Sequence, residues 1–257
     1  MDGAPHWSDG YYGELYLASV RDLLTPRLSA LEAELIARVL SLGSTDRCLD
    51  LACGHGRHAL QLAPRVREIV ALDRSGPYLR LGQRAPAGRG PAPHWVQGDV
   101  RDLPLRSASL DAAWSWYAAL FMFDDTSNLA CLRELARVLR PGGRALVHHA
   151  NPLALALHPR ETAHRTLPGG GIVQEEAEFD PASGVERAHR RLILPGRPVL
   201  AATAELRYYS PAEWRPLAGA AGLRIVQITS TTDAGRTSCP DPGAEAPDLV
   251  AVLEKPT

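Results

Sequence analysis

The stretch that decides the fold is Arg47-Cys-Leu-Asp-Leu-Ala-Cys-Gly-His-Gly-Arg-His-Ala59. Its first half is mainly apolar, and Gly54 and Gly56 follow before a segment with helical character. This order is typical of a strand that passes through a tight glycine turn into a helix. With Ala59 in the last place, the turn also fits the glycine fingerprint of dinucleotide-binding folds, and an acid, Asp73, follows at the expected distance of about 20 residues.

The pattern of strand and helix repeats on both sides of this turn. An amphipathic helix is expected at 25–42, with Thr25 as N-cap and Pro26 at the first helical position. Further helices are predicted at 57–63, 75–83 and 126–139, and strands at 47–53, 68–73, 94–99, 110–116 and 144–149. Strands that alternate with helices in this way predict a doubly wound α/β fold with a mostly parallel sheet.

The second half of the chain departs from this alternation. Extended runs joined by turn-rich segments predict an inserted antiparallel lid, with strands at 171–179, 185–194 and 203–209. Ser210-Pro-Ala-Glu213 is a capping box that predicts a helix as far as Ala221. Runs at 223–229 and 249–253 complete a Rossmann-like sheet of seven strands. We therefore expect a single domain over 1–257, with a helical cap at 1–42, a ligand-binding core at 43–150, the lid at 151–209 and the end of the sheet at 210–257.

The composition is that of an ordinary globular chain. Of 257 residues, 45% are hydrophobic and 22% are charged, which is enough for a sizeable buried core. Lys and Arg total 28 against 29 Asp and Glu, a net charge of −1, so the bulk charge does not favour nucleic acid as a partner. The sequence contains neither a signal-type start nor an apolar run of membrane-spanning length, which predicts a cytoplasmic monomer or homodimer that contacts no membrane.

The cysteines do not form a metal-binding pattern. Cys48, Cys53, Cys131 and Cys239 lack the paired spacing of a metal site, so no bound metal is expected. Cys48 and Cys53 lie in a strand pattern, where thiols usually behave as small apolar side chains.

Asp50 distinguishes between possible ligands of the glycine turn. It is predicted to lie at the end of the first strand, beside the turn. At that position a diphosphate would meet a like charge, whereas an ammonium group would find a counter-ion. The amine of a methionyl group therefore suits the site better than a dinucleotide phosphate.

With these features in place, the sequence resembles the class I S-adenosylmethionine-dependent methyltransferase family, of the small-molecule type. Asp50-Leu-Ala-Cys-Gly-His-Gly56 matches the family's first motif, with Ala52 where the family more often has glycine. Leu132-Arg-Glu-Leu-Ala-Arg-Val-Leu-Arg-Pro-Gly-Gly143 is similar to the family's helix and turn before the fifth strand. The resemblance implies S-adenosyl-L-methionine as the methyl donor and S-adenosyl-L-homocysteine as its product.

The resemblance also implies which residues surround the methyl donor. Asp73 falls where the family binds the ribose hydroxyls, and Asp99 falls where it accepts a hydrogen bond from the adenine amine. Tyr11-Tyr-Gly-Glu-Leu-Tyr16 is similar to the N-terminal lid of small-molecule N-methyltransferases, in which tyrosines and an arginine close over the methionyl end. The expected cofactor-binding residues are Tyr16, Arg27, Asp50, Ala52, Gly54, Gly56, Asp73, Arg74, Asp99, Val100, Ser115 and Trp116.

Two histidines are candidates for acid–base chemistry. His148 and His149 end the fifth predicted strand, at the edge where open α/β sheets bind their ligands. A neutral imidazole there can take the proton from an acceptor hydroxyl or amine. Neighbours on a strand point to opposite faces, so at most one of the two is expected to reach the cleft. A hydrogen-bonded structural histidine is the alternative interpretation.

Together these features predict methyl transfer to an oxygen or nitrogen of a small molecule or short peptide, in natural-product biosynthesis. The cap and the lid would select this acceptor, and alignment of the reacting atoms would matter more than proton transfer. Three alternatives stay open: a nicotinamide-dependent oxidoreductase, which Asp50 disfavours; a non-methylating S-adenosylmethionine-binding relative, such as a cyclase or a binding module; and a methyltransferase of macromolecules. A methyltransferase that acts on the amino groups of nucleic-acid bases is disfavoured, because the Asn/Asp-Pro-Pro-aromatic motif of such enzymes is absent after the fourth strand.

Overall fold

The computed structural model describes residues 7–86, 90–117, 120–231 and 242–257, so Cys239 lies outside the described residues. The helices are α1 (Trp7–Tyr11), α2 (Glu14–Val20), α3 (Pro26–Leu40), α4 (Arg57–Leu62), α5 (Gly76–Gln83), α6 (Asp125–Val138), α7 (Pro152–Leu155) and α8 (Pro211–Ala220), with a 3₁₀ turn at Ala63–Arg65. The strands are β1 (Arg47–Leu51), β2 (Glu68–Asp73), β3 (His94–Gln97), β4 (Leu110–Ser115), β5 (Leu139–Ala150), β6 (Arg160–Thr166), β7 (Ile172–Asp180), β8 (Val185–Ile193), β9 (Leu200–Arg207), β10 (Arg224–Thr229) and β11 (Asp248–Glu254).

The predicted sheet of seven strands is confirmed. Its strand order is β10-β11-β5-β4-β1-β2-β3, and β11 is antiparallel to both of its neighbours while the other pairs are parallel. The order reverses direction at β1, whose register partners Asp50 with Ala71 of β2 and with Trp114 of β4. Such a switch point opens a crevice at the carboxyl ends of the strands, where doubly wound folds bind ligands.

Helices cover both faces of this sheet, and the strand alternation separates two cores. One core joins α3 and α4 to alternate sheet residues: Cys48, Ala112, Leu146 and Val250. The other core joins α6 and α8 to the residues that follow these four in the sequence: Leu49, Ala113, Val147 and Ala251. Because these strands are covered on both faces, they appear in the sequence as nearly continuous apolar runs.

The helix boundaries follow local capping signals. Thr25 accepts a hydrogen bond from the Leu28 amide at 3.1 Å, with Pro26 in the first turn of α3. Ser210 and Glu213 form the predicted capping box of α8. Among the described ranges, no helix combines the length and the apolar character needed to cross a membrane.

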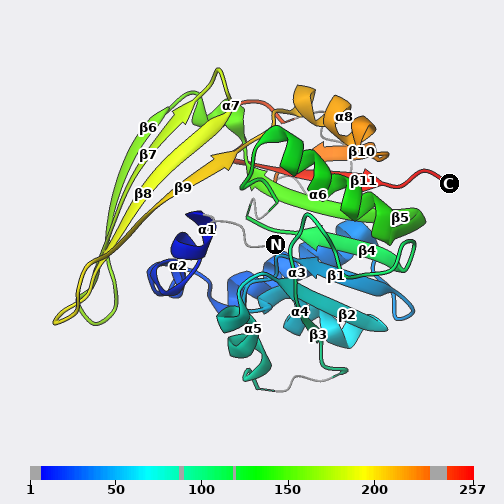
Figure 1. Ribbon diagram of the computed structural model, residues 1–257, viewed down its shortest axis with the longest axis horizontal. Coiled ribbons are helices and arrows are strands. Elements are labelled where there is room, and N and C mark those ends of the chain that lie inside the picture. Colours follow the sequence, from blue (N-terminus) through cyan, green and yellow to red (C-terminus); the bar gives the residue numbers. More distant parts are fainter. Residues whose placement is uncertain (1–6, 87–89, 118–119, 232–241) are drawn as a thin grey trace.

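A second, antiparallel sheet of four strands, β6-β7-β8-β9, is inserted between β5 and α8. Figure 1 shows it as a long sheet that projects from the main body, with α1 and α2 beneath it. The sequence predicted three of these strands but not β6, because nearly every β6 side chain is exposed and the segment has no apolar alternation.

Within the predicted cap region, α1 and α2 are the helices that pack on the inserted sheet, and these two helices are termed the cap. The face of the sheet that they contact is its inner face. Tyr11 lies against Ala188 and Ala204, and Leu15 lies against Val173 and Leu192. The cap therefore sits between the inserted sheet and the crevice of the main sheet.

Both ends of the insertion are fixed by hydrogen bonds. At the outgoing end, the buried Asn151 side chain donates to the carbonyls of Gly243 (2.9 Å) and Ala246 (2.8 Å), and accepts from the Leu153 amide at 3.0 Å. At the returning end, the Ser210 amide donates to Glu213 at 2.8 Å. Glu213 also accepts a hydrogen bond from Arg207, the last residue of β9.

Trp214 fixes α8 to β5 and gives a test of this packing. Its indole is fully buried and donates to Nε2 of His149 at 2.7 Å. Trp214→Phe keeps most of the apolar contact but leaves the buried His149 nitrogen without a donor, so we expect a loss of about 1–3 kcal/mol in the free energy of unfolding. Denaturant titration measures this loss. Leu31→Ala, at a side chain that is 61% exposed, is the control and should change stability by no more than about 0.5 kcal/mol. Equal losses in the two variants would contradict this account of the packing.

Candidate functional site

A cavity of about 410 Å³ lies where the parallel strands β1, β2 and β4 end, with the helical cap over it. Its size falls in the range of small-molecule and cofactor sites. The residues of the expected cofactor set that line it are Tyr16, Asp50, Ala52, Gly54, Asp73, Arg74, Asp99, Val100 and Trp116. Tyr12, Tyr78 and Phe123 add aromatic walls.

The glycine turn between β1 and α4 has the left-handed backbone that glycine favours. Gly56 has a φ of +71°, and a Cβ there would lie 2.4 Å from the Trp95 ring, so only glycine fits. Gly56 thus shapes the turn without lining the cavity. Ala52 also has a positive φ of 56°, which explains why a glycine is common at this position in the family that the sequence resembles.

Asp73 holds this turn from the end of β2. One carboxylate oxygen accepts from the Gly54 amide at 2.7 Å, and the other accepts from the Ser75 amide at 2.7 Å. Burial raises the pKa of Asp73, and the hydrogen bonds from Ser75 and Gly54 oppose that rise. Asp73, which is expected to bind the ribose, therefore also uses both of its carboxylate oxygens to hold the protein backbone.

Asp50 is almost fully enclosed, at 2% exposed, and accepts a hydrogen bond from the Ala59 amide at 3.0 Å. Burial raises its pKa to about 7. A positive group placed beside this carboxylate would stabilise its ionised form, because little water reaches it.

Asp99 lines the cavity, but its carboxylate already has a strong partner. Arg101 donates to its two oxygens at 3.0 and 2.7 Å, and this pairing lowers the pKa of Asp99. The Arg101 guanidinium also lies 4.5 Å from the centre of the Phe123 ring. The two residues thus form a closed edge of the cavity near Val100.

Glu32 is a central residue that the sequence did not reveal. It lies on α3, is 8% exposed, and accepts hydrogen bonds from side chains of two other parts of the chain: Arg57, His58 (3.1 Å), Trp116 (3.1 Å) and Tyr117 (3.0 Å). Burial acts to raise the pKa of Glu32, but the hydrogen bonds from His58 and Arg57 bring it down to about 2. Glu32 lies one turn from Leu28 and from Ile36, on the apolar stripe of this helix, so a carboxylate on the buried face is the local signal that could have identified it.

Arg57 is the second residue that sequence reasoning missed. It lines the cavity, its side chain is 11% exposed, and its guanidinium carbon lies 5.3 Å from the centre of the Tyr117 ring. One guanidinium nitrogen bonds Glu32, whereas Nη2 is buried and has no hydrogen-bond partner among the described residues. A buried N–H without a partner is costly, so a ligand oxygen that reached Nη2 would stabilise it.

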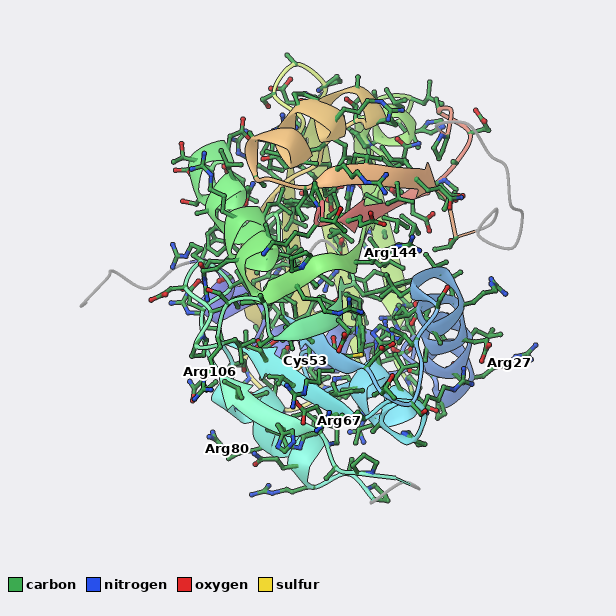
Figure 2. The ribbon with its side chains drawn as sticks, turned by 90° about the vertical axis from the view of Figure 1, so that its right-hand side faces the viewer. Arg27, Cys53, Arg67, Arg80, Arg106 and Arg144 are labelled. Carbon is green, nitrogen blue, oxygen red and sulfur yellow. The ribbon has the colours of Figure 1, made fainter. Side chains whose placement is uncertain are left out.

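Besides Gly56, two expected cofactor residues, Arg27 and Ser115, do not line the cavity. Arg27 is exposed and points outward from the body, as Figure 2 shows, because it lies on the solvent-facing side of the first turn of α3. Ser115 is buried within β4 at 2% exposed, and its hydroxyl has no hydrogen-bond partner among the described residues. Strand alternation turns Ser115 away from the cavity that its neighbour Trp116 lines.

The structure does not bring either candidate base to the cavity. As expected from alternation, His148 and His149 lie on opposite faces of the sheet, stacked on Trp116 and Trp214 respectively. His149 is fully buried, both ring nitrogens are bonded, and burial lowers its pKa to about 4. His148 is 5% exposed and also has both nitrogens engaged. A base needs a free nitrogen near the acceptor, and neither ring offers one.

No metal-binding cluster of three or more His, Cys, Asp or Glu side chains occurs in the part of the chain that the structure describes. Charged and aromatic side chains line the cavity; among them are the buried carboxyl of Asp50 and Arg57, which is paired with Glu32 and whose Nη2 has no hydrogen-bond partner among the described residues.

Comparison with known proteins adds sequence relationships. A family profile described as "Methyltransferase domain" matches residues 48–143. The 2-phytyl-1,4-naphtoquinone methyltransferase of Trichormus variabilis is 36% identical over 107 residues, which are 40% of this chain and 45% of that protein. The chain thus spans under half the length of that relative.

Longer matches follow in sequence and in structure. The demethylmenaquinone methyltransferase of Mycobacterium sp. (strain KMS) is 31% identical over 183 residues, or 70% of this chain and 74% of that protein. The solved structure of the CcbJ methyltransferase from Streptomyces caelestis has a TM-score of 0.78 and 24% identity over 97% of this chain and 99% of that one, a likeness of fold. On the strength of its extended match to the mycobacterial relative, the chain belongs to the class I S-adenosylmethionine-dependent methyltransferase family.

Proposed function

We propose that this protein is an enzyme that transfers a methyl group from S-adenosylmethionine to an oxygen or nitrogen of a small molecule or short peptide. The observation that carries the proposal is that the buried carboxyl of Asp50 and Arg57, whose Nη2 has no hydrogen-bond partner among the described residues, line one cavity. The methionyl tail of S-adenosylmethionine carries an ammonium and a carboxylate, which are the complementary charges. A dinucleotide has no ammonium for Asp50, and its diphosphate would be repelled there.

Different residues of the cavity would bind different parts of S-adenosylmethionine. Asp50 would hold the ammonium, Arg57 the carboxylate, Asp73 the ribose hydroxyls, and Asp99 with Val100 the adenine edge. When bound, S-adenosylmethionine supplies an electrophilic methyl group on a positively charged sulfur. The protein's part is to fix the reacting partners and to exclude water, and Tyr12, Tyr16 and Tyr117 supply walls for that purpose.

The acceptor would enter the part of the cavity that the cap covers, and the cap, supported by the inserted sheet at 151–209, would select it. This proposal is supported by the cap's position, since α1 and α2 contact the inner face of the inserted sheet and Tyr12 and Tyr16 also line the cavity. Neither predicted histidine base lines the cavity, which favours catalysis by alignment rather than by a protein base. A place in natural-product biosynthesis stays a prediction.

The test of this function has two stages. Calorimetry with S-adenosylhomocysteine and with a nicotinamide dinucleotide should give binding for the first ligand only. Incubation with S-adenosylmethionine and a panel of small amines, phenols and short peptides should then yield S-adenosylhomocysteine in step with a product heavier by one methyl group, detected by mass spectrometry. Binding of the dinucleotide alone would support the oxidoreductase alternative, and turnover without a methylated product would support a non-methylating relative.

Arg57→Ala tests the proposed carboxylate contact. Losing a charge-assisted hydrogen bond should weaken S-adenosylhomocysteine binding by about 10- to 100-fold. Affinity for 5′-methylthioadenosine, which lacks the methionyl tail, should stay within about twofold, because the contact was never made. Arg27→Ala removes the same charge from the exposed position and is the matched control for calorimetry with both ligands. Equal weakening of the two ligands by Arg57→Ala would count against the contact.

The pH dependence of binding tests the role of Asp50. Its carboxyl has a pKa of about 7 in the free protein, and an ammonium partner requires the ionised form. Below about pH 7 binding must therefore release a proton, so S-adenosylhomocysteine affinity should fall as the pH drops from 7 to 5.5, by up to about tenfold per pH unit. Asp50→Asn cannot ionise but still accepts from the Ala59 amide, and it should bind weakly with a flat profile. An unchanged slope in Asp50→Asn would assign the titration to another group.

A further inference from the structure

We propose that His148 is a positioning residue for the cofactor cavity: with Asp248 behind it, the imidazole holds the backbone of Tyr117 in the conformation that places the Tyr117 hydroxyl on Glu32. This inference rests on the proposed function, because Glu32 in turn holds Arg57. It gives His148 a role that is neither that of a base nor that of simple core packing.

The Tyr117 backbone needs such a support. Its φ is +60°, a left-handed value that a bulky side chain rarely adopts. The residue directly follows Trp116 at the end of β4, and its ring is 41% exposed and lines the cavity. Backbone strain of this kind persists only where surrounding contacts hold it, and it concentrates at functional sites.

His148 supplies that contact through one defined nitrogen. The Tyr117 amide donates to Nδ1 at 3.2 Å, so Nδ1 carries no proton, and the N–H of the ring is on Nε2. Nε2 faces Asp248 at 3.3 Å. Asp248 is itself fixed by Ser230 (2.7 Å) and by the amide and hydroxyl of Thr231 (2.8 and 2.5 Å). The carboxylate therefore sets the tautomer of the ring, and the tautomer makes Nδ1 an acceptor.

The ring has no freedom to leave this position. It stacks on Trp116 with a centroid distance of 4.4 Å and an interplanar angle of 8°. Trp116 also donates to Glu32, at 3.1 Å. The two aromatic residues thus form one rigid unit beside the cavity.

A continuous series of contacts leads from the sheet to the proposed carboxylate site. Asp248 orients His148, His148 holds the Tyr117 amide, and the Tyr117 hydroxyl donates to Glu32 at 3.0 Å. Glu32 pairs with Arg57, whose Nη2 has no partner among the described residues. Releasing Tyr117 should therefore disturb Arg57 and weaken binding of the methionyl tail.

Two substitutions of His148 separate the roles of its nitrogens. The amide oxygen of Asn reaches the position of Nδ1, whereas the amide of Gln reaches the position of Nε2. His148→Asn keeps an acceptor for Tyr117 and should bind S-adenosylhomocysteine within about twofold of wild type. His148→Gln loses that acceptor and should bind about fivefold to tenfold more weakly in calorimetry. Equal weakening by the two variants would overturn the proposal.

A second background shows whether His148 acts through Tyr117. Tyr117→Gly removes the ring and adopts a positive φ without strain, so the His148 contact has nothing left to position. In this background His148→Gln should change S-adenosylhomocysteine affinity by less than about twofold, because coupled residues are not additive. The same fivefold to tenfold loss as in the wild-type background would overturn the proposal.

Thermal unfolding of each variant separates loss of positioning from loss of fold. If His148→Gln does not fold, Asp248→Asn takes its place: the imidazole stays, and weakened S-adenosylhomocysteine binding is again expected only where Tyr117 is present. Wild-type protein that fails to bind S-adenosylhomocysteine would refute the proposed function. Wild-type binding that His148→Gln leaves unchanged would refute only the role of His148.

Discussion

The carboxylate of Glu32 receives hydrogen bonds from α4 and from the end of β4 while its own backbone belongs to α3. A buried charge of this kind is tolerable only when its partners satisfy it completely, so the three elements are held in one mutual position. That position determines where the Arg57 guanidinium and the Tyr117 ring stand at the cavity. The cavity thus depends on a polar cluster between the core and the cap, in addition to the glycine turn.

Much of the fold could be predicted because its signals are local. β2 runs over Glu68–Asp73 as predicted, since an apolar run that ends in an acid is visible without knowledge of the fold. The Ser210 capping box and the Thr25 N-cap fix α8 and α3 for the same reason. The placements of Asp50 and Asp73 also follow from sequence, because parallel strands bring their carboxyl ends to one edge.

The rest depends on contacts between distant segments. Glu32 and Arg57 meet only when α3 packs on α4, and nothing near either residue in the sequence indicates that pairing. Alternation correctly separates His148 from His149, but it does not predict that Trp116 stacks on the His148 ring or that Asp248 contacts its Nε2. β6 was not predicted because its side chains are nearly all exposed, so the segment has no apolar alternation, and only its backbone pairing with β7 makes it a strand.

The inserted sheet has an architectural consequence of another kind. Its outgoing end is secured by Asn151, and its returning end by Ser210 and Glu213, which also bonds Arg207 at the last position of β9. An insertion anchored in this way can be lengthened, shortened or exchanged during evolution while the parent sheet keeps its geometry. A change in the inserted strands would therefore alter the support of α1 and α2, which pack on Val173, Leu192, Ala188 and Ala204, before it altered the parent sheet.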